Sequence, residues 1–308
     1  MAIIKPPILQ SGDTVGIVTL GSPLDAAVID SRATTLRNMG FNVVFGQYVY
    51  SRSGIVAASA RQRAEDLMMM FENKQVKMIL PSRGGTGVID ILPYLDPRII
   101  RQNPKIITGY SDVTILLNAI NQFTGLETFH GFLLIDFKPD TPAYNYNEFF
   151  TATSSLTAPR VINNPPGISL MSLVSGNVTG QLVGGNLTSI VGALGTPYEI
   201  DTRGKIFLLE DVHAPTNTVY RYLQQLMLAG KFRDCIGIIM GQCTDCPISY
   251  NTSYNDLINS LLVPLGKPLM TNLATAHNYY KITLPIGAEV NLNTVNNTLT
   301  VLRPSVVA

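Results

Sequence analysis

The stretch KIITGYSDVTILLNAI, residues 105–120, predicts a buried strand that turns directly into a helix. Residues 105–108 end the strand, residues 112–120 begin the helix, and Gly109, Tyr110 and Ser111 lie between them. A serine before a helical run is a favoured N-cap, because its oxygen accepts a hydrogen bond from an unpaired backbone N–H. The same position is that of the nucleophile in a strand-to-helix elbow, where backbone N–H groups surround the serine oxygen. The stretch by itself leaves both interpretations open.

The residues on either side repeat the order of strand and helix. Strands are expected at 13–20, 41–46 and 76–82, and helices at 24–40 and 59–73. This alternation predicts an α/β fold with a mostly parallel sheet and helices on both of its faces. Ligand sites in such sheets lie beyond the carboxyl ends of the strands, which is where Ser111 would be.

The composition changes near residue 155, where Ser, Thr, Asn, Pro and Gly become frequent. Beyond residue 180 the pattern has more β character, with strands at 204–212 and 236–242 and a terminal hairpin across residues 294–297. We therefore expect an N-terminal α/β domain over residues 1–158, a linker over 159–179 and a β-rich C-terminal α/β domain over 180–308.

The overall composition excludes several classes of partner. The 308 residues are 46% hydrophobic and carry a formal net charge of +1 without a basic run, so we expect no nucleic-acid partner. The longest uncharged stretch, residues 161–198, is too polar and too broken to span a membrane. The N-terminus lacks the apolar region of a signal peptide, which predicts a cytoplasmic protein.

A nucleophilic serine needs a base, and the chain has only three histidines, His130, His213 and His277. Each could equally be a structural histidine, so the spacing does not choose among them. Glu210, at the end of the apolar run 206–209, is the candidate acid that would orient the base, although it could equally be a solvated residue leaving the sheet. The turn SRGGTG, residues 82–87, offers backbone N–H groups for an oxyanion, or is a plain turn.

The three cysteines, an odd number, do not indicate a disulfide framework. Cys243 and Cys246 form a CTDC pair, but a zinc site would need two further ligands and a redox motif would need a helix directly after the pair. We therefore expect buried or loop thiols, no metal and no cofactor.

Together these pieces resemble the LD-carboxypeptidase family of serine peptidases, which includes the microcin-immunity peptidases. The resemblance spans almost the whole chain. The matching stretches are GDTVGIV (12–18), SRGGTGVIDILPYLD (82–96), PKIITGYSD (104–112), HG (130–131), GQLVGGNLTSIVGALGTPYEID (180–201), IFLLEDV (206–212) and LPIGAEVNLN (284–293).

The resemblance implies a catalytic triad. The Gly-Tyr-Ser-Asp motif implies Ser111 as the nucleophile, and the Leu-Glu-Asp motif implies Glu210 as the acid. The histidine shortly before the Leu-Pro-x-Gly stretch implies His277 as the base. The family fold implies that these residues meet at the interface of an α/β domain and a β-rich domain.

The resemblance also implies an oxyanion hole of backbone N–H groups, here those of Asp112 and of Gly84 or Gly85. We expect three further residues near the substrate, namely Arg83, Thr86 and Phe132. Many relatives have Tyr where this chain has Thr86, and Pro where it has Phe132, and these departures put the substrate in question rather than the chemistry.

The expected activity is hydrolysis of the peptide bond between diaminopimelate and a terminal D-Ala in murein tetrapeptide, during wall recycling. A microcin-type detoxifying peptidase of the same family is the first alternative. An α/β-hydrolase esterase is the second, although GYSDV lacks the second glycine of G-x-S-x-G. A non-catalytic small-molecule binder is the third. The partner would be a small peptide, and self-association into a homodimer stays open.

Overall fold

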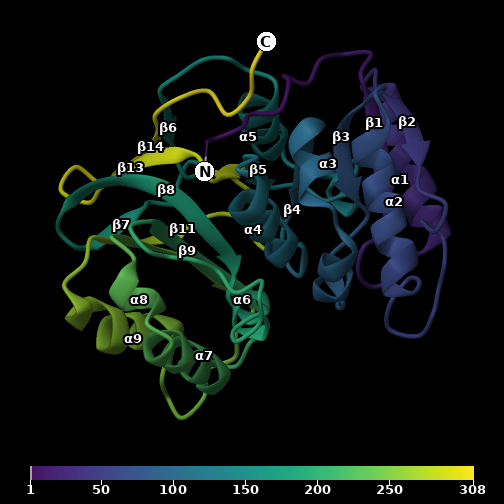
Figure 1. Cartoon of the computed structure of the whole chain (residues 1–308). Helices are drawn as coiled ribbons and strands as arrows, with labels where there is room; N and C mark the ends of the chain where they lie inside the picture. The colour runs from purple at the N-terminus through teal and green to yellow at the C-terminus, as the bar shows by residue number, and fades with distance from the viewer. Residues whose placement is uncertain (1) are drawn as a thin grey trace. The chain divides into compact units, whose positions relative to one another are not determined.

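The computed structural model describes residues 2–308 and divides the chain into two compact units, each with its own sheet (Figure 1). Unit 1 contains the chain up to Leu156, together with Thr283–Gly287 and Ser305–Ala308. Unit 2 contains Thr157–Ile282 and Ala288–Pro304. The chain therefore returns to unit 1 twice after it has entered unit 2.

Unit 1 follows the predicted alternation of strands and helices. Its elements in chain order are β1 (Thr14–Val18), α1 (Ala26–Asn38), β2 (Asn42–Phe45), α2 (Ala60–Glu72), β3 (Val76–Pro81), the 3₁₀ helix η1 (Val88–Tyr94), α3 (Pro97–Gln102), β4 (Ile106–Gly109), α4 (Val113–Thr124), β5 (Thr128–His130), the 3₁₀ helix η2 (Leu134–Asp136), α5 (Ala143–Thr153) and β12 (Leu284–Ile286).

The sheet of unit 1 has the order β12-β5-β4-β3-β1-β2. All neighbours are parallel except β12, which runs antiparallel to β5. The prediction of a mostly parallel sheet is confirmed. From β1 the chain moves to β2 on one side and then to β3 on the other, so the topological switch point lies between β1 and β3. The carboxyl ends of these two strands are where an open α/β sheet binds ligands.

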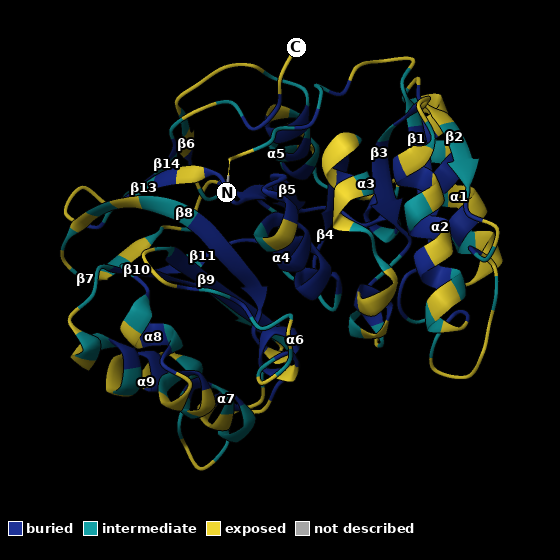
Figure 2. Cartoon of the chain, viewed as in Figure 1, coloured by how far each residue is buried: buried dark blue, intermediate teal, exposed yellow. Residues whose placement is uncertain are grey.

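Helices cover both faces of this sheet. Val15 and Ile17 of β1 pack in a core cluster with Leu36 of α1 and Phe149 of α5. Between them, Gly16 faces the other side, where a Cβ on it would lie 2.6 Å from the Met70 sulfur of α2. The alternation of side chains along a strand thus assigns α1 and α5 to one face and α2 to the other. Figure 2 shows buried strands, helices α1 and α2 with both buried and exposed residues, and α4 almost entirely buried.

Unit 2 is richer in strands. Its elements are β6 (Arg160–Ile162), β7 (Met171–Val174), β8 (Asn177–Asn186), α6 (Leu187–Gly192), β9 (Ile206–Val212), α7 (Thr216–Leu228), α8 (Lys231–Asp234), β10 (Gly237–Thr244), α9 (Tyr254–Leu257), the π-helical η3 (Ile258–Leu262), the 3₁₀ helix η4 (Val263–Leu265), β11 (Leu269–Leu273), β13 (Glu289–Asn293) and β14 (Thr298–Val301).

The sheet of unit 2 has the order β6-β14-β13-β8-β9-β10-β11-β7. Strands β8 to β11 form a parallel centre, and antiparallel strands flank it on both sides. The predicted terminal hairpin is confirmed as β13 and β14. The stretch 159–179, expected to be a linker, contains β6 and β7, which form the two edges of this sheet. Edge strands are short and tolerate polar residues, so composition gives them little signal.

The part of the chain that the structure describes contains no helix long and apolar enough to cross a membrane.

Candidate active site

Ser111 lies in a strained turn between β4 and α4. Its φ is +60°, a left-handed conformation that few residues other than glycine adopt. The helix N-cap is Asp112, one residue later, and no side chain caps the helix. The Ser111 carbonyl, rather than its hydroxyl, enters the helix by accepting a 2.9 Å hydrogen bond from Thr114 N–H. Strain of this kind persists at functional sites, so the geometry favours the elbow over the cap.

The turn after β3 closes on Ser111. A Cβ on Gly84 would lie 2.7 Å from Ser111 Cβ and 3.0 Å from its Oγ, so only glycine allows this approach. Gly85 has a φ of +87°. The turn is held by Ser22, whose N–H donates to Gly84 O at 3.2 Å and whose Oγ accepts from Thr86 N–H at 3.1 Å. The backbone of Gly84 thus forms one wall of the space around the serine.

A carboxylate joins this turn to the elbow. Val88 N–H donates a 2.8 Å hydrogen bond to Oδ2 of Asp112, the residue that follows Ser111. The predicted oxyanion residues, Asp112 and Gly84, lie close together after β4 and β3, since a Cβ on Gly84 would be 3.2 Å from Asp112 N.

The three residues expected near the substrate differ in their surroundings. Thr86 is exposed and Arg83 is half-buried. Phe132 is fully buried, stacked on Phe149 at a ring distance of 5.1 Å and edge-on to Phe137 at 5.3 Å. Because its ring belongs to the core of unit 1, we assign Phe132 to packing rather than to substrate contact.

In unit 2 the structure brings Glu210 and His277 together. His277 Nδ1 lies 2.8 Å from Glu210 Oε2, although 67 residues separate the two in the chain. Glu210 ends the apolar part of β9 and is 1% exposed, and His277 lies in the loop between β11 and β12. A histidine whose Nδ1–H points at a carboxylate is fixed in the tautomer that leaves Nε2 as the proton acceptor.

The loop that carries His277 is held by its own hydrogen bonds. Thr275 Oγ1 donates to Ile282 O at 2.8 Å, and Lys281 Nζ donates to Ala276 O. Ala276 has a φ of +53°, so the residue just before the histidine is in a sparsely populated conformation. The side chain of His277 is 14% exposed, which leaves part of the ring accessible.

Asp211 was the other acid available at this strand end, and it has a different task. Its carboxylate accepts hydrogen bonds from Asn186 Nδ2 at 2.9 Å, Thr188 Oγ1 at 2.7 Å and Thr188 N–H at 3.1 Å. Burial raises the pKa of this carboxyl, and the bond from the Thr188 hydroxyl opposes that shift. Asp211 therefore anchors the start of α6, and Glu210 is the acid that meets a histidine.

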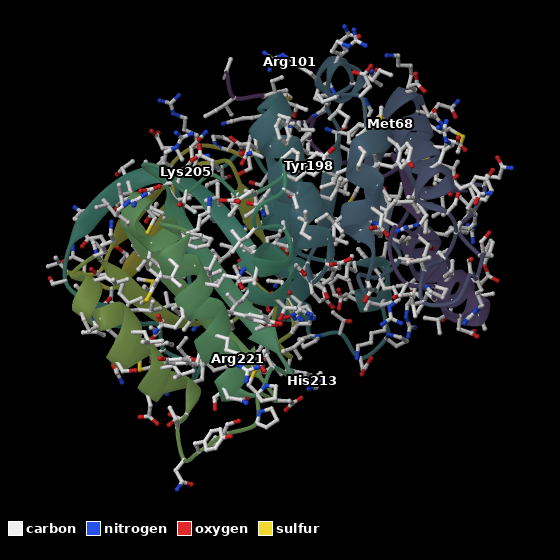
Figure 3. The ribbon with its side chains drawn as sticks, turned by 60° about the horizontal axis from the view of Figure 1, so that its bottom comes forward. Met68, Arg101, Tyr198, Lys205, His213 and Arg221 are labelled. Atoms are coloured by element: carbon white, nitrogen blue, oxygen red, sulfur yellow. A yellow bond between two sulfur atoms is a disulfide. The ribbon has the colours of Figure 1, made fainter. Side chains whose placement is uncertain are left out.

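The two remaining histidines lie in different surroundings. His130 lies in β5 and is fully buried. His213, labelled in Figure 3, is exposed, has a φ of +56° and directly follows β9. Ser111 belongs to unit 1, whereas Glu210 and His277 belong to unit 2.

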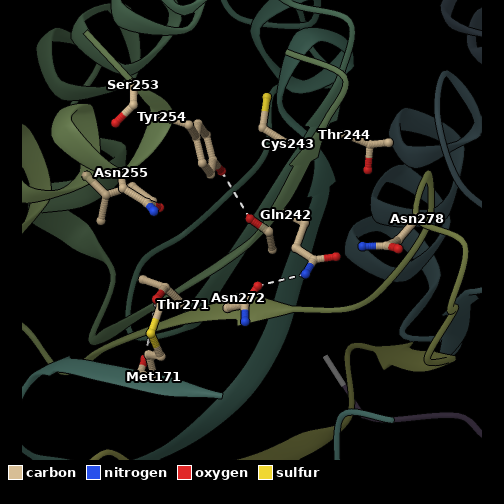
Figure 4. A pocket seen from close by; sticks show the side chains of 12 residues that line it. Met171, Gln242, Cys243, Thr244, Ser253, Tyr254, Asn255, Thr271, Asn272 and Asn278 are labelled. Atoms are coloured by element: carbon tan, nitrogen blue, oxygen red, sulfur yellow. Dashed lines mark hydrogen bonds between the residues drawn. The ribbon is translucent and has the colours of Figure 1, made fainter. Parts of the chain in front are cut away.

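Unit 2 contains a cavity of about 620 Å³ that sequence reasoning missed (Figure 4). Gln242 and Asn272 line it, with Gln242 Nε2 donating to Asn272 Oδ1 at 2.7 Å. Tyr254 also lines it and donates to Gly241 O at 3.2 Å. Gly241 connects the cavity to the acid, because a Cβ on it would lie 2.9 Å from Glu210 Cβ. The signal in the sequence was the polar Gln242 at the end of the predicted strand 236–242.

The CTDC pair corrects an expectation. Cys243 and Cys246 form a disulfide with a Cα–Cα distance of 5.6 Å, whereas free thiols were expected there. The pair lies at the end of β10, where the chain turns and brings the two residues within bonding reach, and this turn is not visible in the sequence. Cys235 is a buried free thiol. Among residues 2–308 no group of three or more His, Cys, Asp or Glu side chains is placed to hold a metal ion.

Comparisons with known proteins cover both units. The model of the LD-carboxypeptidase N-terminal domain matches residues 15–131, and that of the LD-carboxypeptidase C-terminal domain matches residues 179–292. A probable murein peptide carboxypeptidase of Bacillus subtilis is 36% identical over 303 residues, which cover 96% of this chain and 93% of that protein. The microcin C7 self-immunity protein MccF of Escherichia coli is 26% identical over 336 residues, with 98% and 97% covered. The crystal structure of a muramoyltetrapeptide carboxypeptidase from Oxalobacter formigenes is similar with a TM-score of 0.81 at 26% identity, covering 93% of this chain and 97% of that one.

Proposed function

Because the chain belongs to the LD-carboxypeptidase family and is a serine-type carboxypeptidase of it, we propose that it removes the terminal D-Ala from murein tetrapeptide with Ser111, His277 and Glu210 as its triad. The hydrogen bond of 2.8 Å between Glu210 and His277 is the observation that carries this proposal. It supports His277 as the base, because it gives that histidine the carboxylate partner that a general base needs.

In the proposed first step Ser111 Oγ attacks the carbonyl carbon of the bond before the D-residue. His277 Nε2 takes the serine proton, and Glu210 stabilises the imidazolium through Nδ1–H. The carbonyl oxygen becomes an oxyanion, which the backbone N–H groups of Asp112 and of Gly84 or Gly85 would stabilise. One such donor is worth about 3–4 kcal/mol in comparable sites.

In the proposed second step the tetrahedral intermediate collapses. The carbon–nitrogen bond breaks, and His277 returns its proton to the leaving amine, so that D-Ala departs and an acyl-serine remains. Water then attacks the ester with His277 again as base, which releases the tripeptide acid and restores Ser111. This cycle uses water alone as co-reactant and calls for no metal.

The substrate is proposed from the relatives. The B. subtilis protein and the O. formigenes protein are both named for murein peptides, and the former is the more similar in sequence. The similarity to MccF supports a microcin-type detoxifying peptidase as a second candidate. We also propose that the enzyme acts in the cytoplasm during wall recycling, on a small peptide and without nucleic acid or membrane. Light scattering of the purified protein would decide between monomer and homodimer.

Three matched peptides test the activity. The first is L-Ala-γ-D-Glu-diaminopimelate-D-Ala, the second ends in L-Ala, and the third ends in the amide of D-Ala. We expect cleavage of the first only, because inversion at the terminal centre would put a methyl group where a hydrogen was and shift the reacting carbonyl. A shift of about 1 Å can cost roughly 100-fold in rate.

The controls separate the candidates. Ser111→Ala should be inactive on all three peptides. Equal kcat/KM on the first two peptides would contradict the proposed stereospecificity. Efficient cleavage of an aminoacyl-nucleotide of the microcin type, with none of the tetrapeptide, would replace the first candidate with the second.

A further inference from the structure

Unit 1 contains a buried arginine that takes no direct part in the proposed hydrolysis. Arg63 lies in α2 and is 1% exposed. Burial lowers the pKa of its guanidinium, and the nearby Asp90 carboxylate opposes that shift. Burying a charged group is costly unless hydrogen bonds and opposite charge compensate, so the partners of Arg63 indicate its purpose.

The guanidinium binds the loops at the topological switch point. Its Nη1 donates to Gly87 O at 2.7 Å and also to Leu20 O, and its Nε donates to Ala58 O at 2.9 Å. Its Nη2 lies 3.5 Å from Asp90 Oδ2. Leu20 follows β1 and Gly87 ends the turn after β3, so one side chain joins the carboxyl ends of these two neighbouring strands.

One peptide group connects this arginine to the serine elbow. The carbonyl of the peptide between Gly87 and Val88 accepts from Arg63, and its N–H donates to Asp112 Oδ2 at 2.8 Å. A peptide group is planar and rigid, so a partner that holds its oxygen also fixes the direction of its N–H. A cation on one side and a carboxylate on the other polarise the group and strengthen both bonds.

We propose that Arg63 is a positioning residue for the hydrolysis, acting through the Gly87–Val88 peptide and Asp112 on the Ser111 turn. This inference rests on the proposed function of Ser111. Without the guanidinium, the peptide can rotate, the Asp112 carboxylate loses its fixed donor, and the backbone around Ser111 is no longer held at its distance from Gly84. The displaced backbone around Ser111 stabilises the transition state less well but binds the substrate as before, so kcat falls while KM changes little.

The experiment compares Arg63→Met and Arg63→Lys with Arg61→Met. Arg61 is an exposed arginine of the same helix, with its guanidinium 5.4 Å from the Tyr94 ring centre, and serves as the matched control. The readouts are kcat and KM on the D-Ala tetrapeptide, the rate of Ser111 modification by a fluorophosphonate, and Tm. The fluorophosphonate tests the serine and its oxyanion donors without the peptide.

We expect Arg63→Met to lower kcat roughly 10- to 100-fold, the effect of a misplacement of up to about 1 Å, with KM within about threefold. Modification by the fluorophosphonate should slow by a similar factor. Arg63→Lys keeps the charge but reaches fewer carbonyls, so its kcat should lie between that of Arg63→Met and that of the wild-type enzyme. Arg61→Met should have the wild-type kcat. Asp112→Asn weakens the same connection from its other end and should also lower kcat. In the double variant Arg63→Lys, Asp112→Asn the loss of kcat should be smaller than the two single effects combined.

Folded Arg63 variants with kcat and modification rates within about twofold of the unchanged enzyme would overturn the proposal, as would a rise in KM alone. If Arg63→Met does not fold, Arg63→Lys and Asp112→Asn carry the same test. If the wild-type enzyme reacts with the fluorophosphonate and the Arg63 variants keep its kcat and modification rate, only this inference is refuted. An unchanged enzyme that neither cleaves the peptide nor reacts with the fluorophosphonate refutes the proposed function itself.

Discussion

Replacing Gly84 with alanine tests the close approach of the β3 turn to Ser111. The added methyl group would lie 2.7 Å from Ser111 Cβ, 3.0 Å from its Oγ and 3.2 Å from Asp112 N. Gly84 is not among the glycines with a positive φ, so its backbone conformation is open to alanine. Any effect of Gly84→Ala therefore comes from the volume of one methyl group.

The size of the effect follows from the distances. Ordinary contact begins at 3.4 Å, so the two Cβ atoms must separate by 3.4 − 2.7 = 0.7 Å. The turn has little room to move away from Ser111. Gly84 O accepts from Ser22 N–H at 3.2 Å and packs so closely on Gly21 that a Cβ there would lie only 2.3 Å from it. The Ser111 elbow therefore takes most of the displacement. A shift of about 1 Å costs roughly 100-fold, so we expect kcat to fall roughly 10- to 100-fold, or about 1.4–2.7 kcal/mol.

The assay is release of D-Ala from the tetrapeptide, with kcat and KM determined separately and Tm measured on the same samples. Gly192→Ala is the control, because Gly192 also lacks a positive φ and a Cβ on it would meet no atom within 4 Å. The reasoning is refuted if Gly84→Ala keeps kcat within about twofold while folding normally. It is also refuted if only KM rises, since the methyl group would then obstruct the substrate rather than move the serine.

Four further predictions concern the serine, the base, the need for a metal and a buried carboxyl group. Ser111→Ala should lower kcat by about 10⁴-fold or more, whereas a mere cap would cost about 1 kcal/mol of stability and leave an active enzyme. His277→Gln should abolish turnover and His213→Gln should leave most of it; the reverse result would move the base to the other histidine. EDTA should leave kcat unchanged, and loss of activity restored by zinc would contradict the metal-free mechanism. Burial raises the pKa of Glu127 from 4.5 to about 8, so the folded protein holds a proton that the unfolded chain releases, and stability should fall as pH rises from about 4.5 to 8. Glu127→Gln should remove this fall, and equal pH slopes of Tm for the two proteins would disprove the shift.

The sequence alone determined the parts of this protein that depend on neighbours in the chain. The alternation of short apolar runs with helical patterns predicted the parallel sheet of unit 1, because strand and helix each impose their own periodicity. The break at Gly109–Tyr110–Ser111 located the serine turn for the same reason. The resemblance of motifs then pointed to Glu210 and His277, which composition and spacing could not distinguish from their alternatives.

Tertiary structure alone decided what depends on residues far apart in the chain. The hydrogen bond between His277 and Glu210 joins residues 67 apart in the chain, and the return of β12 to the sheet of unit 1 rests on pairing with β5. Arg63 occupies the apolar face of α2 together with Leu67 and Met70, and only the carbonyls that meet there explain a charge in that position. Local patterns record which face of an element is buried, but not which distant group it meets, because many pairings satisfy the same pattern until the whole chain is packed.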